Sequence, residues 1–170
     1  MSAHLVPYAP SMREELREIF FESSTKKDFP DEASRENFFH KYLGFYLEQY
    51  PDLTWVAQGD RILGYVAAAP HSSSPELNKL QPHLEVFTEH IHKFPAHLHI
   101  NCHAESRGQG IGGKLISKIE EELKARNING LHIMTGPDSL NKNFYRKLGF
   151  TYELMGNFQG SAILFMGKVL

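Results

Sequence analysis

Apolar residues follow two different spacings along this chain, and the changes between those spacings predict the order of its helices and strands. In residues 111–126 the apolar positions repeat every four residues, as on the buried face of an α-helix; they are Ile111, Leu115, Ile119 and Leu123. In residues 96–102 every second residue is apolar, which indicates a β-strand. Both segments therefore have one face suited to a core.

The same spacings divide the remaining chain. We expect further strands over residues 3–9, 53–58, 61–70, 130–135, 151–155 and 161–169. We expect further helices over residues 10–20, 31–50, 82–94 and 139–149, and a loop over residues 71–80. Gly59 and Asp60 form a hairpin turn, whereas other strands are separated by helices. This order predicts an α/β (α+β) fold with a mixed sheet.

The composition is that of a globular protein and narrows the range of partners. Hydrophobic residues make up 41% of the chain, so residues 1–170 are predicted to form one domain with its own core. The net charge of −2 gives no general basic field for nucleic acid. Cys102 is the only cysteine, which excludes an intrachain disulfide. The chain has no run of about 18 apolar residues, so we expect no membrane span and a cytoplasmic location.

The segment "ESRGQGIGGKL", residues 105–115, places glycines directly before a predicted helix, and this arrangement suits phosphate binding. The dinucleotide motif G-x-G-x-x-G at residues 108–113 lacks the strand that should lead into it and the acidic residue of the next strand. The P-loop motif needs Ser or Thr where this chain has Leu115. The pattern R-x-x-G-x-G is complete, with Arg107, Gly110 and Gly112.

This third pattern resembles the acyl-CoA-dependent N-acetyltransferases of the GNAT superfamily. Residues 143–150, "NFYRKLGF", look like the second signature of that family, which contains a tyrosine. Residues from about 94 to 170 are also similar to the acetyltransferase-like domain of O-GlcNAcase enzymes and its free-standing bacterial relatives. The resemblance implies a GNAT fold, a twisted and mostly antiparallel sheet of about six or seven strands flanked by about four helices.

The resemblance also implies acetyl-CoA as the cosubstrate and suggests its contacts. Its pyrophosphate would be held by Arg107, Gly108, Gln109, Gly110, Ile111, Gly112, Gly113 and Lys114. The backbone of Ile100 and Cys102 would bind the pantetheine arm as a neighbouring strand does, and Asn141 would supply an amide. Tyr145 would donate a proton to the thiolate leaving group.

Two candidates remain for the general base, a histidine and a chain of water molecules. His97 and His99 share one face of the predicted strand 96–102, and an imidazole titrates near neutral pH; we assign the role to His99. In the O-GlcNAcase-like branch we expect an aspartate at the position of Asn101. The histidines of this region follow no metal-ligand spacing, so we expect no metal.

Two functions remain, and they belong to different classes. The first is an N-acetyltransferase, a monomer or homodimer, in which a primary amine attacks the acetyl thioester in a ternary complex. Its acceptor would lie between residues 31–50, whose aromatic stripe suits either a core or a ligand wall, and residues 71–94. The second is a non-catalytic module that binds acetyl-CoA or a partner protein. Thiol release that depends on an amine separates the two.

Overall fold

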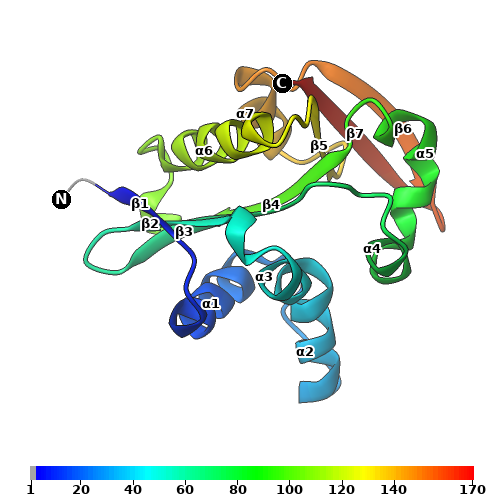
Figure 1. The fold of residues 1–170 in the computed structure, drawn as a ribbon. Helices are drawn as coiled ribbons and strands as arrows, with labels where there is room; N and C mark the ends of the chain where they lie inside the picture. The colour runs from blue at the N-terminus through cyan, green and yellow to red at the C-terminus, as the bar shows by residue number, and fades with distance from the viewer. Residues whose placement is uncertain (1–2) are drawn as a thin grey trace. The chain divides into compact units, whose positions relative to one another are not determined.

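The computed structural model describes residues 3–170 and contains a seven-stranded sheet in the order β1-β2-β3-β4-β5-β7-β6. Its strands are β1 (His4–Pro7), β2 (Thr54–Gln58), β3 (Ile62–Ala69), β4 (Ala96–Cys102), β5 (Gly130–Thr135), β6 (Tyr152–Phe158) and β7 (Ser161–Val169) (Figure 1). Strands β4 and β5 are parallel, whereas β1–β2, β2–β3, β5–β7 and β6–β7 are antiparallel pairs. The predicted mixed sheet is therefore confirmed.

Seven α-helices accompany the described strands. They are α1 (Arg13–Ser23), α2 (Glu32–Phe39), α3 (Phe45–Gln49), α4 (Pro75–Leu80), α5 (Thr88–Ile91), α6 (Ile111–Ala125) and α7 (Asn141–Lys147). The apolar face predicted for α6 is confirmed, because Ile111, Leu115, Ile119 and Leu123 are all buried. Among residues 3–170, no helix combines the length and the apolar character that crossing a bilayer requires.

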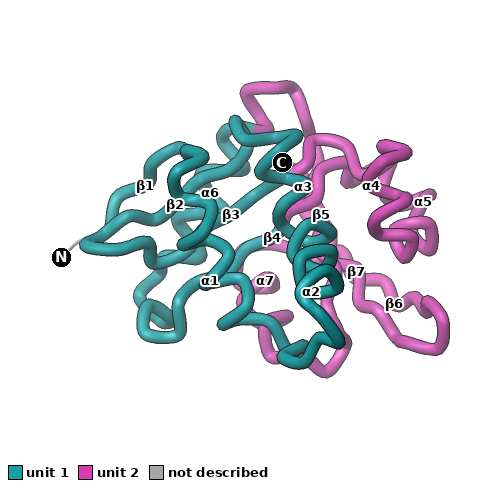
Figure 2. Tube along the Cα trace, turned by 90° about the horizontal axis from the view of Figure 1, so that it is seen from below, with its two compact units in different colours: residues 1–68, 99–122 teal, residues 69–98, 123–170 magenta. Residues whose placement is uncertain are grey.

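The chain divides into two compact units that alternate along the sequence (Figure 2). One unit contains the chain up to Ala68 and residues His99–Glu122, and the other contains Ala69–Leu98 and Leu123–Leu170. The boundaries fall within β3, β4 and α6, so these three elements contribute residues to each unit.

In the first unit, helices cover both faces of the strands. Helices α1, α2 and α3 lie on one face of β1–β3, and α6 lies on the other (Figure 1). On the α6 side, the Lys118 ammonium lies 4.3 Å from the Trp55 ring. On the α1 side, the ring centroids of Phe20 and His99 are 5.6 Å apart. The side chain of His99 therefore lies on the face that α1 covers.

The second unit is built on an antiparallel ladder in which β7 pairs with both β5 and β6. Phe165 of β7 is fully buried, and the rings of Phe87 and His132 lie 5.0 and 4.7 Å from it. The parallel register of β4 with β5 pairs Ala96 with Leu131 and His97 with His132, at the amino ends of both strands.

The prediction of a loop over residues 71–80 is wrong in part, because the second half of this segment forms helix α4. The Ser74 hydroxyl accepts a hydrogen bond from the Leu77 N–H at 3.2 Å, and Pro75 occupies the first turn. Serine at the N-cap followed by proline is a helix start, and the buried Leu77 anchors the short helix.

Two predicted helices are interrupted. In the segment 31–50, a π-helical turn over His40–Gly44 separates α2 from α3, and this turn shifts the buried face by one residue. In the segment 82–94, a 3-10 helix over Pro82–Phe87 precedes α5. The buried residues Leu84, Phe87 and Ile91 are spaced by three and then by four, which matches a 3-10 turn followed by an α-turn.

Candidate functional site

The loop between β4 and α6, residues 103–110, has a backbone that only glycine adopts easily at two positions. We call it the cradle loop. Gly108 and Gly110 have φ angles of 78° and 76°, in the left-handed region. A Cβ atom added at either glycine would meet nothing within 4 Å, so the space above both is open. A group larger than a methyl can therefore approach this backbone.

Helix α6 begins directly after this loop. Its first turn is closed by the Lys114 N–H, which donates to the Gly110 carbonyl at 3.2 Å. The N–H groups of Ile111, Gly112 and Gly113 precede this bond and have no acceptor inside the helix. They carry the positive end of the helix dipole, which favours an anion.

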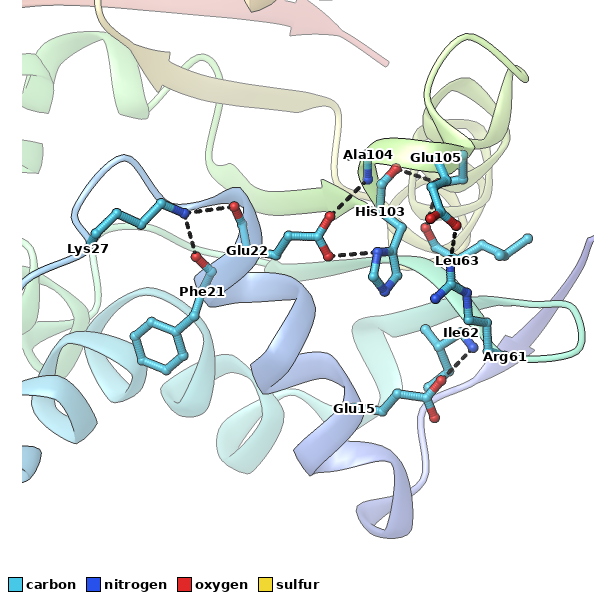
Figure 3. A network of polar contacts seen from close by, with 11 residues as sticks. Glu15, Phe21, Glu22, Lys27, Arg61, Ile62, Leu63, His103, Ala104 and Glu105 are labelled. Atoms are coloured by element: carbon cyan, nitrogen blue, oxygen red, sulfur yellow. Dashed lines mark hydrogen bonds and ion pairs between the residues drawn. The ribbon is translucent and has the colours of Figure 1, made fainter.

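Polar contacts hold the cradle loop against β3. The His103 N–H donates to the Leu63 carbonyl at 2.9 Å, and the buried Ser106 hydroxyl lies 2.8 Å from the same carbonyl oxygen. Arg61 forms an ion pair with Glu105 (Figure 3). The Gln109 amide donates to the Glu105 carbonyl at 2.9 Å. Gln109 is therefore already engaged within the loop.

A cavity of about 510 Å³ lies beside the cradle loop on the side of the β2–β3 turn; it is lined by Gly59, Asp60, Arg61, Leu63, Glu105, Ser106 and Gln109. Among these residues only Gln109 belongs to the predicted site. Neither Gly108 nor Gly110 is among the residues that line this cavity.

The carboxyl end of β4 carries Ile100 and Cys102, both half-buried. A Cβ atom added at Gly64 of β3 would lie 2.8 Å from the Cys102 sulfur and 2.9 Å from the Asn101 carbonyl oxygen. Glycine at position 64 therefore lets β3 approach β4 closely at this end. Burial raises the pKa of the Cys102 thiol to about 11, so the thiol stays protonated and is a poor nucleophile at neutral pH.

His99, Asn101 and Tyr65 form a chain of hydrogen bonds in the first unit. The Asn101 amide donates to the Tyr65 hydroxyl at 2.9 Å, and that hydroxyl lies 3.2 Å from Nδ1 of His99. The hydroxyl keeps one proton of its own, and where it donates that proton to Nδ1, the proton of the neutral ring lies on Nε2. Burial lowers the pKa of His99 to about 4 and raises the pKa of Tyr65.

His97 lies in the second unit and stacks on His132, with ring centroids 4.9 Å apart. His132 is fully buried, and its Nδ1 donates to the Phe94 carbonyl at 2.6 Å. Its Nε2 has no hydrogen-bond partner among the described residues. Burial lowers the pKa of His132 to about 4, so this imidazole is neutral at pH 7.

Tyr145 and Asn141 lie on α7, in the second unit. The Tyr145 ring is buried, with its centroid 5.2 Å from that of Phe144 and 5.5 Å from that of Phe150. The Asn141 carbonyl oxygen accepts a hydrogen bond from the Thr135 hydroxyl at 2.8 Å. Gly149, with a φ angle of 90°, follows the helix and permits the sharp turn into β6.

The predicted residues therefore divide between the units. The first unit brings together His99, Ile100, Cys102 and the residues Arg107–Lys114, whereas Asn141 and Tyr145 belong to the second. Tyr65 was not among the predicted residues, and its only signal in the sequence is a hydroxyl-bearing ring within the apolar strand "ILGYVAAA". Within residues 3–170, no cluster of three or more His, Cys, Asp and Glu side chains suits a metal ion.

Comparison with solved structures supports the fold. The crystal structure of SsHAT is 20% identical in sequence, with a TM-score of 0.78 over 99% of this chain and 98% of that chain. The PaiA N-acetyltransferase of Thermoplasma acidophilum, solved in complex with coenzyme A, is 18% identical, with a TM-score of 0.66 over 100% of both chains. The phosphinothricin acetyltransferase of Sinorhizobium meliloti, solved in complex with acetyl-CoA, is 21% identical, with a TM-score of 0.64 over 100% of this chain and 89% of that chain.

Comparison at the level of sequence identifies the family. No curated protein matches this chain. The family model described as an acetyltransferase (GNAT) domain matches residues 51–152, which include β4, the cradle loop, α6 and α7. The similarity to the O-GlcNAcase-like branch stays a prediction. The predicted GNAT resemblance is confirmed: this chain belongs to the GNAT acetyltransferase family.

Proposed function

We propose that the protein is an acetyl-CoA-dependent N-acetyltransferase that transfers the acetyl group directly to a primary amine in a ternary complex. The observation that carries this proposal is the cradle loop, where Gly108 and Gly110 leave their backbone open in front of α6. A dinucleotide or Mg²⁺-nucleotide site would need residues that this segment lacks. A pyrophosphate needs only the free N–H groups of a helix start and unhindered access to them.

The cradle loop and the first turn of α6 would hold the pyrophosphate of acetyl-CoA. The N–H groups from Gly108 to Gly113 supply donors, and the exposed side chains of Arg107 and Lys114 supply positive charge. Gln109 stabilises the loop through its bond to the Glu105 carbonyl. Glycine suits both positions 108 and 110, because a side chain at either one would occupy the space that the phosphates need.

The carboxyl end of β4 would bind the pantetheine arm through the backbone of Ile100 and Cys102. The backbone N–H and C=O groups of these two residues would pair with the arm as those of a neighbouring strand do. Asn141 would add an amide contact. Its carbonyl oxygen is held by Thr135, which leaves the amino group of the same amide for a donor role.

The chemical step forms one bond and breaks another. The neutral amine nitrogen attacks the thioester carbonyl carbon, the C–S bond breaks, and the nitrogen loses a proton. We assign Tyr145 as the acid that protonates the thiolate leaving group, because a phenol held by Phe144 and Phe150 has a fixed orientation. An amide product needs a nitrogen that gives up a proton, and a primary amine supplies one.

We assign His99 as the group that takes the proton from the amine, and this role requires a specific tautomer. The ring must present a lone pair on Nε2, so Nδ1 must carry the proton and donate to the Tyr65 oxygen. The Tyr65 hydroxyl then donates to the carbonyl oxygen of Asn101. The side-chain amide of Asn101 can either donate a hydrogen bond to Tyr65 or accept one from it. Rotation of this amide would therefore convert His99 from a donor into a base.

The second candidate is a module that binds acetyl-CoA without turnover, and the His99–Tyr65–Asn101 chain is the observation that favours it. In the tautomer with the ring proton on Nε2, that nitrogen donates, and the pKa of about 4 makes the imidazole a weak base. Two measurements separate the candidates. Calorimetric titration with acetyl-CoA tests the cradle loop, and thiol release with a panel of primary amines tests turnover.

These measurements have distinct outcomes. The enzyme binds acetyl-CoA and releases thiol only when an amine is present, whereas the module binds acetyl-CoA and releases none. A protein that binds no acetyl-CoA at saturating concentration contradicts both candidates.

A further inference from the structure

Glu22 occupies a position that is unfavourable for a carboxylate in a helix. It is the penultimate residue of α1, where the helix dipole places partial negative charge. Glu14 and Glu15 of the same helix lie in the first turn, where a negative charge is stabilising. Helix preference therefore does not account for an acidic residue at position 22, and its contacts must.

The Glu22 carboxylate binds the beginning of the cradle loop (Figure 3). One oxygen accepts a hydrogen bond from the Ala104 N–H at 3.2 Å, and the other lies 2.6 Å from Nδ1 of His103. The Ala104 N–H is the main reason that the pKa of Glu22 is lowered, and His103 lowers it further. The carboxylate is therefore ionised at neutral pH and binds two consecutive residues that directly follow β4.

The end of α1 is itself held in place. The Lys27 ammonium donates to the carbonyl oxygens of Phe21 and Glu22, both at 2.9 Å (Figure 3). A cation on the last carbonyls of a helix neutralises its negative end. The backbone of Glu22 is thus fixed from one side, while its side chain fixes the loop on the other.

We infer that Glu22 is a positioning residue that holds the cradle loop in the conformation that binds the cosubstrate. The inference rests on the proposed function, since it concerns the loop proposed to hold the pyrophosphate. A charged hydrogen bond to Ala104 sets where the loop leaves β4, and the left-handed Gly108 and Gly110 follow only four and six residues later. Without this bond the loop has more conformations, and binding must select one of them.

Glu15 provides a matched control on the same helix. It lies seven residues before Glu22, which places both side chains on nearly the same face of α1. Glu15 also accepts a backbone hydrogen bond, from the Ile62 N–H at 2.6 Å, but its partner is the first residue of β3 (Figure 3). Replacing Glu15 therefore removes the same kind of contact, but one that joins α1 to β3 and not to the cradle loop.

The test is calorimetric titration of acetyl-CoA into the wild type and three variants, with thermal unfolding of each. Glu22→Ala is expected to weaken binding about tenfold, as the loss of a charged hydrogen bond would, and to lower Tm by several degrees, as one lost hydrogen bond predicts. Glu22→Gln keeps an acceptor for Ala104 and should bind within about threefold of the wild type. Glu15→Ala should bind as the wild type does and should unfold several degrees lower, roughly as one lost hydrogen bond predicts.

Hydrogen exchange gives a second measurement that needs no ligand. The amide of Ala104 should exchange faster in Glu22→Ala than in the wild type, and Glu15→Ala should leave its rate unchanged. If turnover is detected, Glu22→Ala should raise KM for acetyl-CoA and leave kcat unchanged.

The failures of the two proposals differ. Tight wild-type binding that Glu22→Ala leaves unchanged overturns the inference alone, as does equal weakening by Glu22→Ala and Glu15→Ala. Absence of acetyl-CoA binding by the wild type overturns the proposed function and the inference with it.

Discussion

The amide of Asn101 allows the hydrogen-bond chain through Tyr65 to run in either direction, and that direction decides whether His99 donates or accepts a proton. In the observed arrangement the amide donates to Tyr65, whose hydroxyl lies 3.2 Å from Nδ1 of His99. When that hydroxyl donates to Nδ1, His99 carries its proton on Nε2. A carboxylate at the same position can only accept. It would force the Tyr65 hydroxyl to donate away from His99, which would leave the lone pair on Nε2.

The substitution Asn101→Asp tests this account of His99. The added carboxylate raises the pKa of the imidazole from about 4 toward neutrality, and it selects the tautomer that acts as a base. We expect kcat at pH 7 to rise several-fold, roughly as a stronger general base predicts, and the acidic limb of the kcat profile to move to higher pH. Rate measurements between pH 5 and pH 8 check both effects.

A double variant supplies the control for this prediction. Adding Tyr65→Phe removes the hydroxyl that links position 101 to His99, so the gain should vanish. A gain in kcat that persists without the hydroxyl would show that the added carboxylate acts directly on substrate and not through His99.

Tyr145→Phe tests the proposed acid. The ring keeps its contacts with Phe144 and Phe150, so the variant should fold as the wild type does. Loss of a general acid typically costs about 100-fold in rate or more, so kcat should fall by about that factor while Kd for acetyl-CoA stays unchanged. An unchanged kcat in an active preparation would exclude Tyr145 from proton transfer.

At the scale of elements, the cradle loop depends on glycine for its backbone and for the space above it. Gly110→Ala places a Cβ in the left-handed region at a cost of about 1 kcal/mol and narrows the approach to α6. We expect about fivefold weaker binding of acetyl-CoA, as a strain of about 1 kcal/mol predicts. Calorimetry on purified variants measures this directly.

Gly160→Ala is the matched control for this prediction. Gly160 has a φ angle of 83°, it also has nothing within 4 Å of an added Cβ, and it lies in the turn between β6 and β7. The backbone strain is the same, so stability should fall by a similar amount, but affinity for acetyl-CoA should not change. Equal effects of both variants on binding would mean that Gly110 acts only through stability.

Elements with a strong local signal could be predicted from the sequence. The four-residue repeat in α6 is set by one buried face, and that helix formed as predicted. Strand β4 also formed as predicted, although its burial does not alternate: residues 96–98 are buried and residues 99–102 are half-buried. The short elements could not be predicted as well. The start of α4 depends on one side-chain bond at Ser74, and the break between α2 and α3 depends on a π-turn that no apolar spacing distinguishes from a continuous helix.

The candidate site shows the same difference. The glycine pattern specifies the backbone of the cradle loop, because left-handed φ angles leave few alternatives to glycine. Contacts between residues that are far apart in the sequence have no such pattern in the sequence. Tyr65 meets His99 and Glu22 meets Ala104 only because β3, β4 and α1 pack together, so both contacts required the structure.

For the whole molecule, buried histidines predict sensitivity to acid. The folded protein holds His132 neutral with a pKa of about 4, whereas an unfolded chain protonates histidine near 6.5. Between these values the unfolded state binds more protons, so stability is full above pH 6.5 and falls as the pH drops toward 4. The loss from His132 amounts to about 3 kcal/mol over this window.

His132→Phe tests this prediction through the slope of stability against pH. The variant keeps a ring against Phe165 but cannot titrate, so its Tm should change less between pH 7 and pH 4.5 than that of the wild type. His71→Phe, at an exposed position, should leave the wild-type slope intact. Identical slopes in the wild type and His132→Phe would mean that His132 does not remain neutral in the folded state.

Thiol release from acetyl-CoA, with mass detection of the acetylated amine, tests the central proposal most directly. With acetyl-CoA at a concentration that calorimetry shows to be saturating, we predict thiol release that rises and saturates with a primary amine, matches amide product one to one, and falls about 100-fold in Tyr145→Phe. Bound acetyl-CoA with no amine-dependent thiol release across the panel would contradict the assignment as an N-acetyltransferase.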